Sequence, residues 1–395
     1  MATTFDVLIV GAGNLGLWTA YHLAKRRVGR IAVCERYWAG FGATSRSAGV
    51  VRQQGGSETA VKLGKWSREL YLALGPELGL DSGFTETGYY VLAETEEERA
   101  AFLDLVNLRR ACGVENTWLD ADEGRRRFPA IDWEGFRGAT YTPDDGYVHP
   151  PIVARNITQA VMRADAIDLY ERCAVEGIAQ VGGAFRVTTS RGVFEAGRVL
   201  DAAGPRGVRN VGAMLDVRVP VSATRHQIIT FPTTGASGPP APFPMFFALR
   251  QGIYVRAEEQ GALLGMSNPD DRADRTDRYQ IGYDWEYHDR MRPVWESFFP
   301  SVAGLPVSRA WAASIDYTPD HLPIIDQPLP GFYVLAAGGH GMMWGPALGL
   351  KGAELIATGQ VADLPADEIT LGRFAVQRER PDAIALPFPV DEDEA

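Results

Sequence analysis

The sequence predicts an α/β protein in which a Rossmann-like domain is joined to an α+β domain with a large mixed sheet. Two observations predict the Rossmann-like domain. An apolar run at 5–10 is followed by a glycine-rich turn and a helical pattern, and the same order recurs over 332–359. A third observation predicts the other domain: residues 216–300 are rich in short apolar runs, prolines and aromatic residues, as expected for short strands joined by turns.

Each element is predicted by the period of its apolar residues and by the glycines that bound it. The strands are expected at 5–10, 30–35, 88–93, 173–179, 185–189, 197–204 and 332–337. The helices are expected at 17–27, 58–74, 96–112, 152–166 and 346–359. The stretch beyond Leu386 is acidic and contains prolines, so we expect it to be loose.

Composition excludes several classes of protein. The chain has 395 residues, of which 46% are hydrophobic and 23% charged, and its net charge is −11. An acidic chain does not favour a polyanion, so we expect no nucleic-acid partner. The three cysteines lack metal or disulfide-framework spacing, and no other metal-ligand cluster stands out, so we expect no metal site. No apolar run approaches the ~20 residues of a membrane span, and we expect a cytoplasmic protein.

The turn after the first strand has the spacing of a dinucleotide-binding motif. Gly11, Gly13 and Gly16 follow a strand and open a helix. In such a motif the first glycine permits the turn, the second lets the backbone approach a pyrophosphate, and the third allows close helix–strand packing. Glu35 ends the next strand, 19 residues after Gly16, where an acidic side chain can bind ribose hydroxyls. This context predicts nucleotide binding.

Two further glycine-rich segments favour FAD over NAD. The loop 42–49 is small and polar, and suits backbone and hydroxyl contacts to a long ligand. The segment 338–343 lies between a strand and a helix, and a helix N-terminus can stabilise negative charge on a reduced flavin. An NAD-dependent dehydrogenase would share only the first motif.

At these residues the chain resembles the FAD-dependent amine and amino-acid oxidoreductases of the D-amino-acid oxidase superfamily, over nearly its whole length. The resemblance continues through the segments 138–146, 202–204, 311–323 and 339–347. Within the superfamily, residues 51–54, 87–89 and 226–227 look most similar to the beta subunit of dye-linked L-proline dehydrogenase. The sarcosine oxidase and D-arginine dehydrogenase branches look similar as well.

The resemblance implies a discontinuous FAD-binding domain and a substrate-binding domain. The first would comprise 1–85, 146–215 and 305–370, the second 86–145 and 216–304, with 371–395 as a C-terminal tail. The implied cofactor contacts are Gly11, Gly13, Asn14, Gly16, Glu35, Arg36, Thr44, Ser45, Arg46, Ser47, Ala48, Gly49, Val50, Val175, Ala203, Gly204, Gly339, His340, Gly341, Met342 and Met343.

Departures from the family pattern bear on the flavin chemistry. Residues 312–314 contain no cysteine where monomeric sarcosine oxidases attach their flavin, so we expect FAD to be non-covalent. Residues 241–270 contain no lysine that would promote reaction with oxygen, which favours a dehydrogenase over a fast oxidase. Met343 replaces a second, substrate-binding lysine, and this disfavours sarcosine itself.

The expected reaction is hydride transfer from the α C–H of an amine or amino acid to flavin N5, which gives an imine. Arg52 is the first candidate for binding a substrate carboxylate, since Arg pairs bidentately with carboxylates; the alternative is a structural Arg. Arg250 and Arg256 are further candidates on strand-like segments. His340 is a candidate for cofactor contact and catalysis, with turn capping as the alternative.

Three more residues are candidates for the substrate pocket. His226 could line it or be a hydrogen-bonded structural histidine. Tyr254 and Trp344 could wall the amine or attract its cation, and core packing is the alternative for both. We count Tyr254 with Arg52 and His340 among the catalytic candidates.

Partners and context stay open at this level. We expect a small amino acid or amine and an electron acceptor, either oxygen or a dye- or quinone-type acceptor. Two alternatives are an FAD-holding subunit of a heteromeric dehydrogenase and a biosynthetic amine oxidase for a larger substrate. Both homo- and hetero-oligomers are left open.

Overall fold

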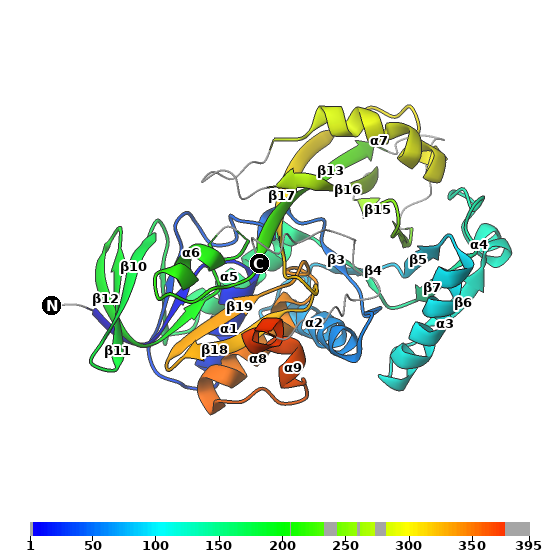
Figure 1. Cartoon of the computed structure of the whole chain (residues 1–395). Helices are drawn as coiled ribbons and strands as arrows, with labels where there is room; N and C mark the ends of the chain where they lie inside the picture. The colour runs from blue at the N-terminus through cyan, green and yellow to red at the C-terminus, as the bar shows by residue number, and fades with distance from the viewer. Residues whose placement is uncertain (1–2, 206, 233–242, 259–260, 273–281, 376–395) are drawn as a thin grey trace.

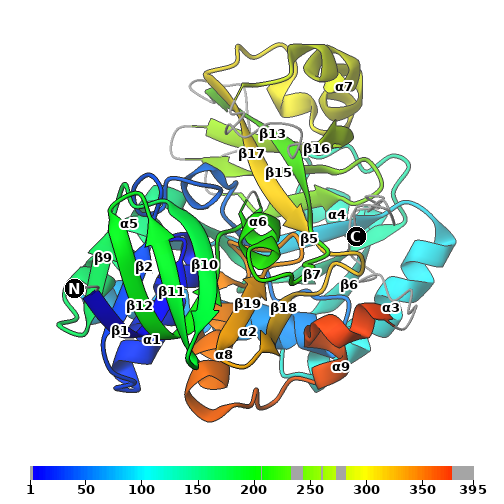
Figure 2. The same cartoon turned by 60° about the vertical axis from the view of Figure 1, so that its left-hand side comes forward.

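Two eight-stranded sheets form the framework of the protein (Figures 1 and 2). The computed structural model describes residues 3–205, 207–232, 243–258, 261–272 and 282–375. The predicted fold class, an α/β protein with a second, large mixed sheet, is confirmed.

The first sheet has a parallel centre with antiparallel strands at its margins. Its parallel strands run in the order β9, β2, β1, β12, β19, and Val7 of β1 pairs with Ile31 of β2 and with Arg198 of β12. The strands of this sheet are β1 (Thr3–Val10), β2 (Ile31–Cys34), β9 (Ile167–Tyr170), β10 (Val175–Val181), β11 (Ala184–Thr189), β12 (Gly192–Asp201), β18 (Ile324–Leu329) and β19 (Phe332–Ala336). The strand ends that precede glycine-rich turns therefore meet at one edge, where ligands bind in parallel sheets.

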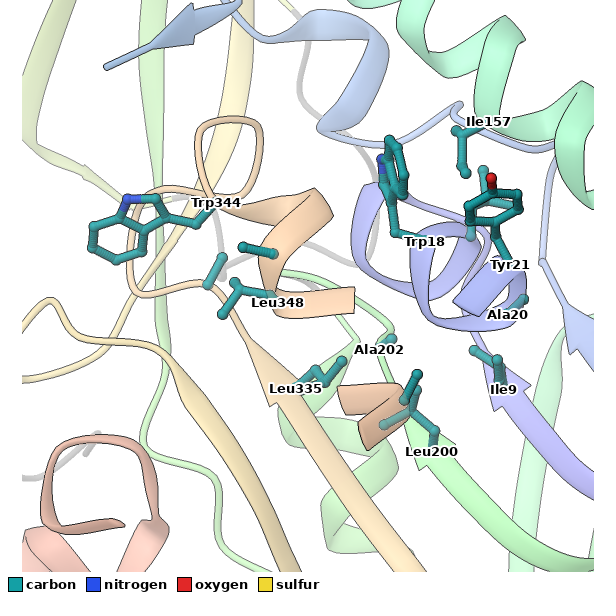
Figure 3. Close-up of a cluster of buried hydrophobic side chains, with 14 of the residues drawn as sticks. Ile9, Trp18, Ala20, Tyr21, Ile157, Leu200, Ala202, Leu335, Trp344 and Leu348 are labelled. Carbon is teal, nitrogen blue, oxygen red and sulfur yellow. The ribbon is translucent and has the colours of Figure 1, made fainter. Parts of the chain in front are cut away.

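Two of the helices packed on or beside this sheet cross each other closely. The helices of this set are α1 (Asn14–Lys25), α2 (Glu58–Glu77), α5 (Pro150–Met162), α6 (Val208–Ala213) and α8 (Gly345–Thr358). A Cβ at Gly349 would lie 2.4 Å from Cβ of Trp18, so glycine allows α8 to cross α1 closely. Figure 3 shows Trp18 and Tyr21 of α1 and Leu348 of α8 among the buried side chains of this core.

The second sheet is antiparallel except where β14 and β5 pair in parallel. Its strands, in spatial order, are β17 (Arg309–Tyr317), β13 (Ser222–Pro232), β16 (Gly261–Arg272), β15 (Ile253–Glu258), β14 (Met245–Ala248), β5 (Tyr89–Ala93), β7 (Gly138–Thr142) and β6 (Thr117–Asp120). The helices that accompany it are α3 (Glu96–Ala111), α4 (Ala121–Arg127), α7 (Trp285–Phe298) and the short η2 (Pro300–Val302).

A small third sheet joins the two halves. It comprises β3 (Val50–Val51), β8 (Gly146–Val148) and β4 (Phe84–Glu86), and it follows the short 3-10 turn η1 (Thr44–Arg46). The described chain ends with α9 (Ala366–Ile369) and η3 (Leu371–Ala375).

Local signals fix where several helices begin. Ser57 caps α2 by accepting a hydrogen bond from the Ala60 N–H, and Asp284 caps α7 in the same way. Thr95 and Glu98 form a reciprocal capping box at the start of α3. Gly359, with φ of +77°, ends α8 in the left-handed conformation that glycine adopts without strain.

The structure corrects the prediction of short strands throughout 216–300. This region contains an 11-residue strand, β13, a 12-residue strand, β16, and the 14-residue helix α7. In α7 the buried Tyr287, Trp295 and Phe298 lie on one face, and its charged residues together with Pro293 obscure that period in the sequence.

Two further boundaries differ from the sequence analysis. Strand β17 falls in the segment that we assigned to the cofactor domain, but it pairs with β13 in the second sheet. In the predicted tail, Arg373 is buried and its Nε lies 2.7 Å from Asp320 Oδ2, so residues 371–375 are anchored to the body. The rest of that tail, with the segment beyond Leu386, lies outside the described residues.

Candidate active site

The three glycines of the first turn are required for different reasons. A Cβ at Gly11, where φ is +103°, would lie 2.5 Å from the Ala202 carbonyl oxygen. A Cβ at Gly16 would lie 2.0 Å from the Gly11 carbonyl oxygen, so both positions exclude side chains by packing. A Cβ at Gly13 would meet only Thr44 Oγ1, at 3.4 Å, and Gly13 lines a cavity. Gly13 is thus the glycine that leaves room for a ligand at the start of α1.

Asn14 ties the three glycine-rich segments together. Its backbone N–H donates to Thr44 Oγ1 at 3.0 Å. Its Nδ2 donates to the Gly341 carbonyl at 2.9 Å and to the Tyr71 hydroxyl at 2.8 Å. Asn14 therefore fixes the start of α1 against the 42–49 loop through its backbone N–H and against the 338–343 turn through its side chain.

Glu35 is held in a defined orientation at the end of β2. Its Oε2 accepts from the Ala12 N–H at 3.0 Å, and its Oε1 accepts from the Tyr37 N–H at 2.9 Å. The carboxylate lines the cavity next to Arg36. This is the arrangement expected of a group that receives ribose hydroxyls.

The turn before α8 presents a neutral histidine. His340 Nδ1 lies 3.1 Å from the Gly338 carbonyl, and since a carbonyl only accepts, Nδ1 carries the proton and Nε2 holds a lone pair. Desolvation, followed by the positive charge of Arg52, holds the pKa of His340 well below its usual value. Trp344 stacks on the ring at 4.0 Å between centroids.

One cavity of about 470 Å³ connects these segments with the second sheet. Its nucleotide end is lined by Gly13, Glu35, Val175 and Gly204, and the wall from the second sheet includes Ile228, Phe247, Tyr254 and Ala313. The predicted cofactor residues that line it are Gly11, Gly13, Asn14, Glu35, Arg36, Thr44, Ser47, Ala48, Val50, Val175, Ala203, Gly204, Gly339, His340, Gly341, Met342 and Met343. The donor set, the glycine that leaves space and the cavity's reach across both sheets fit an extended dinucleotide such as FAD.

Four predicted cofactor residues do not line the cavity. Gly16 is a packing glycine, as described above. Ser45 is exposed, the Arg46 carbonyl accepts from Trp311 Nε1 at 2.8 Å, and a Cβ at Gly49 would lie 2.1 Å from the Val148 carbonyl oxygen. These residues shape the loop from behind.

Arg52 lies in the cavity wall, where its positive charge acts on the pKa of both Tyr89 and His340. The side chain is buried, and Nη1 donates to the Gln54 carbonyl. Buried amides fix the backbone around it: the Gln53 N–H donates to Asp145 Oδ1 at 2.8 Å, and Gln54 Nε2 donates to the Tyr89 carbonyl at 2.8 Å. The two residues that follow Arg52 are therefore held in place, and one of them accepts a hydrogen bond from its guanidinium.

Two tyrosines line the cavity together with Arg52. Tyr254 is buried against Gly265, where a Cβ would lie 1.9 Å from Cζ of the ring. Burial raises the pKa of both Tyr254 and Tyr89, so both stay protonated. Among the described residues neither hydroxyl has a hydrogen-bond partner, and both residues line the cavity. Each hydroxyl is free to bind a ligand there.

His226 lines the cavity as a hydrogen-bonded wall residue. Its Nε2 lies 2.9 Å from the Tyr317 hydroxyl and its Nδ1 lies 3.0 Å from Ser267 Oγ. Burial lowers the pKa of His226 to about 3, so the ring is neutral. With both nitrogens engaged, His226 orients Tyr317 in the cavity wall.

The other three predicted substrate residues lie outside the cavity lining. The exposed Arg250 pairs with Glu98, with Nη2 and Oε1 3.0 Å apart. Arg256 is buried, and its Nε donates to the Ala48 carbonyl at 2.6 Å while Nη1 lies 2.7 Å from Glu258 Oε2. Trp344 is buried behind His340. We therefore drop these three as substrate contacts, since their polar groups or rings are engaged elsewhere.

Several lining residues were not predicted from the sequence. Tyr89, Tyr317 and His321 fall within segments that carry the family resemblance but were not named as site candidates, and Phe247 was not considered. Cys34 and Cys173 also line the cavity, at its nucleotide end. Two sequence signals could have predicted such residues: the strand alternation around Phe247, and the position of Cys34 next to Glu35 in the sequence.

Comparison with known proteins identifies the family. The chain matches the family model described as FAD dependent oxidoreductase over residues 6–355, and it therefore belongs to that family. This confirms the resemblance to the D-amino-acid oxidase superfamily, and the cofactor of the family is FAD. The chain is accordingly an enzyme of the FAD-dependent oxidoreductase class.

Individual relatives cover the chain almost completely. It is 30% identical to the glycine oxidase of Geobacillus kaustophilus over 396 residues, covering 95% of this chain and all of the relative. It is 26% identical to the sarcosine oxidase subunit beta of Rhodobacter capsulatus, covering 90% and 85%. The crystal structure of L-proline dehydrogenase from P. horikoshii superposes with a TM-score of 0.84 at 25% identity, covering 95% and 99%.

Some relatives are much longer than this chain. It spans 44% of the length of the 4-methylaminobutanoate oxidase (formaldehyde-forming) of Paenarthrobacter nicotinovorans, at 26% identity over 91% of its own length.

Within the described ranges, no group of three or more His, Cys, Asp or Glu side chains is placed to hold a metal ion. None of the described helices has the length and apolar character needed to cross a bilayer.

Proposed function

We propose that the protein oxidises the CH–NH bond of an amino acid or a secondary amine to an imine, with FAD as the electron acceptor. The observation that carries the proposal is the single cavity that joins the nucleotide end at Glu35 to a pocket formed by Arg52, Tyr89 and Tyr254. Bound FAD would supply the two-electron acceptor for the hydride of the substrate.

The residues of the pocket suit a small amine that carries a carboxylate. Arg52 would bind the carboxylate, because a guanidinium offers two parallel donors. The hydroxyls of Tyr89 and Tyr254 would add hydrogen bonds, and the wall formed by Ile228 and Phe247 would exclude water. Exclusion of water lowers the pKa of a substrate ammonium group and favours the neutral amine that the reaction needs. Nε2 of the neutral His340 can accept a hydrogen bond from that group.

The names of similar proteins support this substrate class. Glycine, sarcosine and L-proline are all small α-amino acids, and they appear in the names of a glycine oxidase, a sarcosine oxidase subunit and an L-proline dehydrogenase. Among the described cavity residues there is no lysine, and Met343 stands at the position discussed above. This supports a dehydrogenase that passes electrons to a dye- or quinone-type acceptor over a fast oxidase.

The test is anaerobic reduction of the flavin. The purified holoprotein is mixed with L-proline, sarcosine, glycine, and D- and L-amino acids, and the visible flavin band is followed. We expect at least one of these compounds to bleach the band, and air then separates an oxidase from a dehydrogenase. A protein that carries flavin but is reduced by none of them contradicts the amino-acid proposal.

The variant Arg52→Met tests whether Arg52 binds the substrate carboxylate. Losing a hydrogen-bonded ion pair costs roughly 1.5–3 kcal/mol, so kcat/KM for the identified amino acid should fall roughly 10- to 100-fold. For the corresponding amine without the carboxylate, which is the control, kcat/KM should change little. An equal loss for both compounds would argue that Arg52 supports the pocket without binding carboxylate.

A second candidate is that the chain is the FAD-holding subunit of a heteromeric enzyme. The match to a relative named as a subunit, the sarcosine oxidase subunit beta, favours this alternative. Catalysis by the isolated chain with an artificial acceptor distinguishes the two, since a holding subunit alone would turn over none of the compounds.

A further inference from the structure

A buried arginine in the last described segment reaches a turn that borders the cavity. Arg373 lies in η3, and the turn comprises residues 318–322, between β17 and β18. Arg373 Nε lies 2.7 Å from Asp320 Oδ2, and its Nη2 lies 3.0 Å from Asp320 Oδ1. The same Nη2 donates to the Leu322 carbonyl at 3.0 Å, and both charged side chains are buried. The guanidinium therefore holds both a side chain and the backbone of the turn.

The turn also has hydrogen bonds of its own. The Thr318 hydroxyl donates to the Leu322 carbonyl at 2.7 Å, and the Leu322 N–H donates to Asp320 Oδ1 at 3.1 Å. Within the turn His321 has φ of +59°, in the left-handed region that a residue with a Cβ enters only at a cost. Such a conformation persists where the surrounding contacts over-determine it. Arg373 adds contacts from outside the turn.

The turn places a histidine in the cavity wall. His321 is buried and lines the cavity, and its ring centre lies 5.0 Å from that of Tyr317, which also lines the cavity. The Tyr317 hydroxyl lies 2.9 Å from His226 Nε2. The backbone of His321 therefore sets where one member of a connected group of lining side chains lies.

The same turn supports the glycine-rich turn before α8. A Cβ at Gly338, where φ is +62°, would lie 2.6 Å from the Leu322 carbonyl oxygen and 2.8 Å from the His321 carbonyl oxygen. The Gly338 carbonyl in turn accepts from His340 Nδ1 at 3.1 Å. The carbonyl that Arg373 binds is thus the one against which Gly338 packs. A shift of Leu322 would move Gly338, and with it the hydrogen bond that orients His340.

We propose that Arg373 is a positioning residue for the cofactor site. Through an ion pair and one carbonyl it holds the turn 318–322, and this turn keeps His321 in the cavity wall and supports the turn that carries His340. Arg373 is not among the residues that line the cavity, so its effect on a bound cofactor is indirect. This role rests on the prediction that the segment 338–343 contacts FAD, and it does not depend on which substrate is oxidised.

Two variants separate the contacts of Arg373. Arg373→Met combined with Asp320→Asn removes the guanidinium without leaving a buried charge unpaired, and asparagine can still accept from the Leu322 N–H. Arg373→Lys keeps a positive charge beside Asp320, but one ammonium group cannot reproduce both the bidentate pair and the donor to the Leu322 carbonyl. If the double variant does not fold, Arg373→Lys still tests the proposal.

The first measurement is hydrogen exchange, with saturating FAD and again after FAD removal. The reporters are the N–H groups of His321, Leu322 and His340, which all donate hydrogen bonds. In both variants they should exchange about tenfold faster or more, since a hydrogen bond from a charged donor contributes a factor of that size. The control is Arg198→Met, whose guanidinium donates to the Ile356 carbonyl at 3.1 Å, away from the cavity lining. It should leave exchange at these N–H groups unchanged.

The second measurement is FAD titration. The dissociation constant of FAD should rise roughly fivefold or more in both Arg373 variants, because a loosened pocket must be ordered again on binding. The visible absorption band of the bound flavin should shift, which a loss of stability alone does not produce. Arg198→Met should lower the melting temperature without either effect.

Three results would overturn the proposal. The Arg373 variants could match Arg198→Met in both measurements, which would make Arg373 a residue that only stabilises the fold. Arg373→Lys could restore both to their original values, which would show that charge alone suffices. Faster exchange with unchanged FAD affinity and spectrum would separate the turn 318–322 from the cofactor. Neither measurement uses an amine, so failure of the proposed substrate class would be seen separately.

Discussion

The first glycine-rich turn separates packing from ligand binding residue by residue. At Gly16 a Cβ would lie within 2.0 Å of backbone oxygen, whereas at Gly13 it would only touch the Thr44 hydroxyl at 3.4 Å. The same substitution must therefore affect the free protein at one position and the complex at the other.

We expect Gly13→Ala to leave the melting temperature of the apoprotein nearly unchanged and to weaken FAD binding about tenfold or more, which corresponds to about 1.4 kcal/mol. Gly16→Ala should destabilise the apoprotein itself, by roughly 1–3 kcal/mol or more, because the backbone has to shift. Calorimetry and FAD titration measure the two effects. Gly282→Ala, with nothing within 4 Å of its Cβ, is the control. Equal effects at 13 and 16 would contradict this division.

A buried carboxyl beside Arg52 gives a prediction about pH. Burial raises the pKa of Asp145 from 3.8 to about 7, and the hydrogen bonds from Gln53 oppose this only in part. Between these two pH values the folded protein holds a proton that the unfolded chain has released. The stabilisation is therefore complete below pH 4 and is lost as pH rises to about 7.

Asp145→Asn removes this dependence. The free energy of unfolding of the original protein, relative to that of the variant, should fall by roughly 2–4 kcal/mol between pH 4 and pH 8. Urea titrations at several pH values measure it. A difference that stays constant, or one that grows with pH, would show that the carboxyl is ionised in the folded protein at low pH.

At the scale of elements, the loop at 44–50 is held from three directions. Thr44 accepts from the start of α1, Trp311 of β17 donates to the Arg46 carbonyl, and Arg256 of β15 donates to the Ala48 carbonyl. The Arg256 guanidinium also lies 4.2 Å from the ring centre of Tyr147 in β8. The second sheet thus fixes a loop that lines the cavity of the first.

Arg256→Met should loosen this loop. It removes the nearer of two ion-pair partners of the Glu258 carboxylate and leaves Arg309, whose Nη2 lies 3.5 Å from Oε1. Losing one member of a buried ion pair costs roughly 3–5 kcal/mol, less here because Arg309 remains and Glu258 is partly exposed. We expect a lower melting temperature and weaker FAD binding. Arg256→Met with Glu258→Met should recover stability but not affinity, and Arg250→Met at the surface should change neither. Full recovery of FAD affinity in the double variant would exclude the loop as the cause.

Elements with a clear local period could be predicted from the sequence, and those without one could not. The strand–turn–helix at 3–25 and the helix at 345–358 are visible because glycines and apolar periods coincide. Helix α7 was missed because its buried aromatic residues lie among charges. The place of β17 was missed because strand pairing depends on a partner about ninety residues away in the sequence.

The candidate site shows the same limit. Nucleotide residues were foreseen because a turn and its ligand contacts are local in sequence. The pocket around Arg52 draws on β5, β13, β14 and β15, and its members meet only through the second sheet. Whether Arg256 or Arg52 faced the cavity depended on strand register, which one sequence does not specify.

At the scale of the whole molecule, the cavity spans both sheets, so parts of one ligand should protect different regions. We expect ADP to slow hydrogen exchange at 11–16 and 35–37, and FAD to slow it there and also at 44–50, 313–317 and 339–343. Mass-spectrometric exchange on apoprotein with saturating ADP or FAD measures this. Protection of 313–317 by ADP alone would mean that the two ends are coupled without a bridging ligand.

The strand order of the first sheet also constrains how the chain acquires its shape during synthesis. The N-terminal β1 lies between β2 and β12, and β12 in turn needs β19, which is translated more than a hundred residues later. The second sheet waits for β17 in the same way. Neither half can close as a unit while the ribosome is still translating the middle of the message, and nascent chains must keep apolar strands unpaired until residues 309–336 emerge. Chains truncated before residue 309 should therefore depend on chaperones, even though their glycine-rich turn is complete.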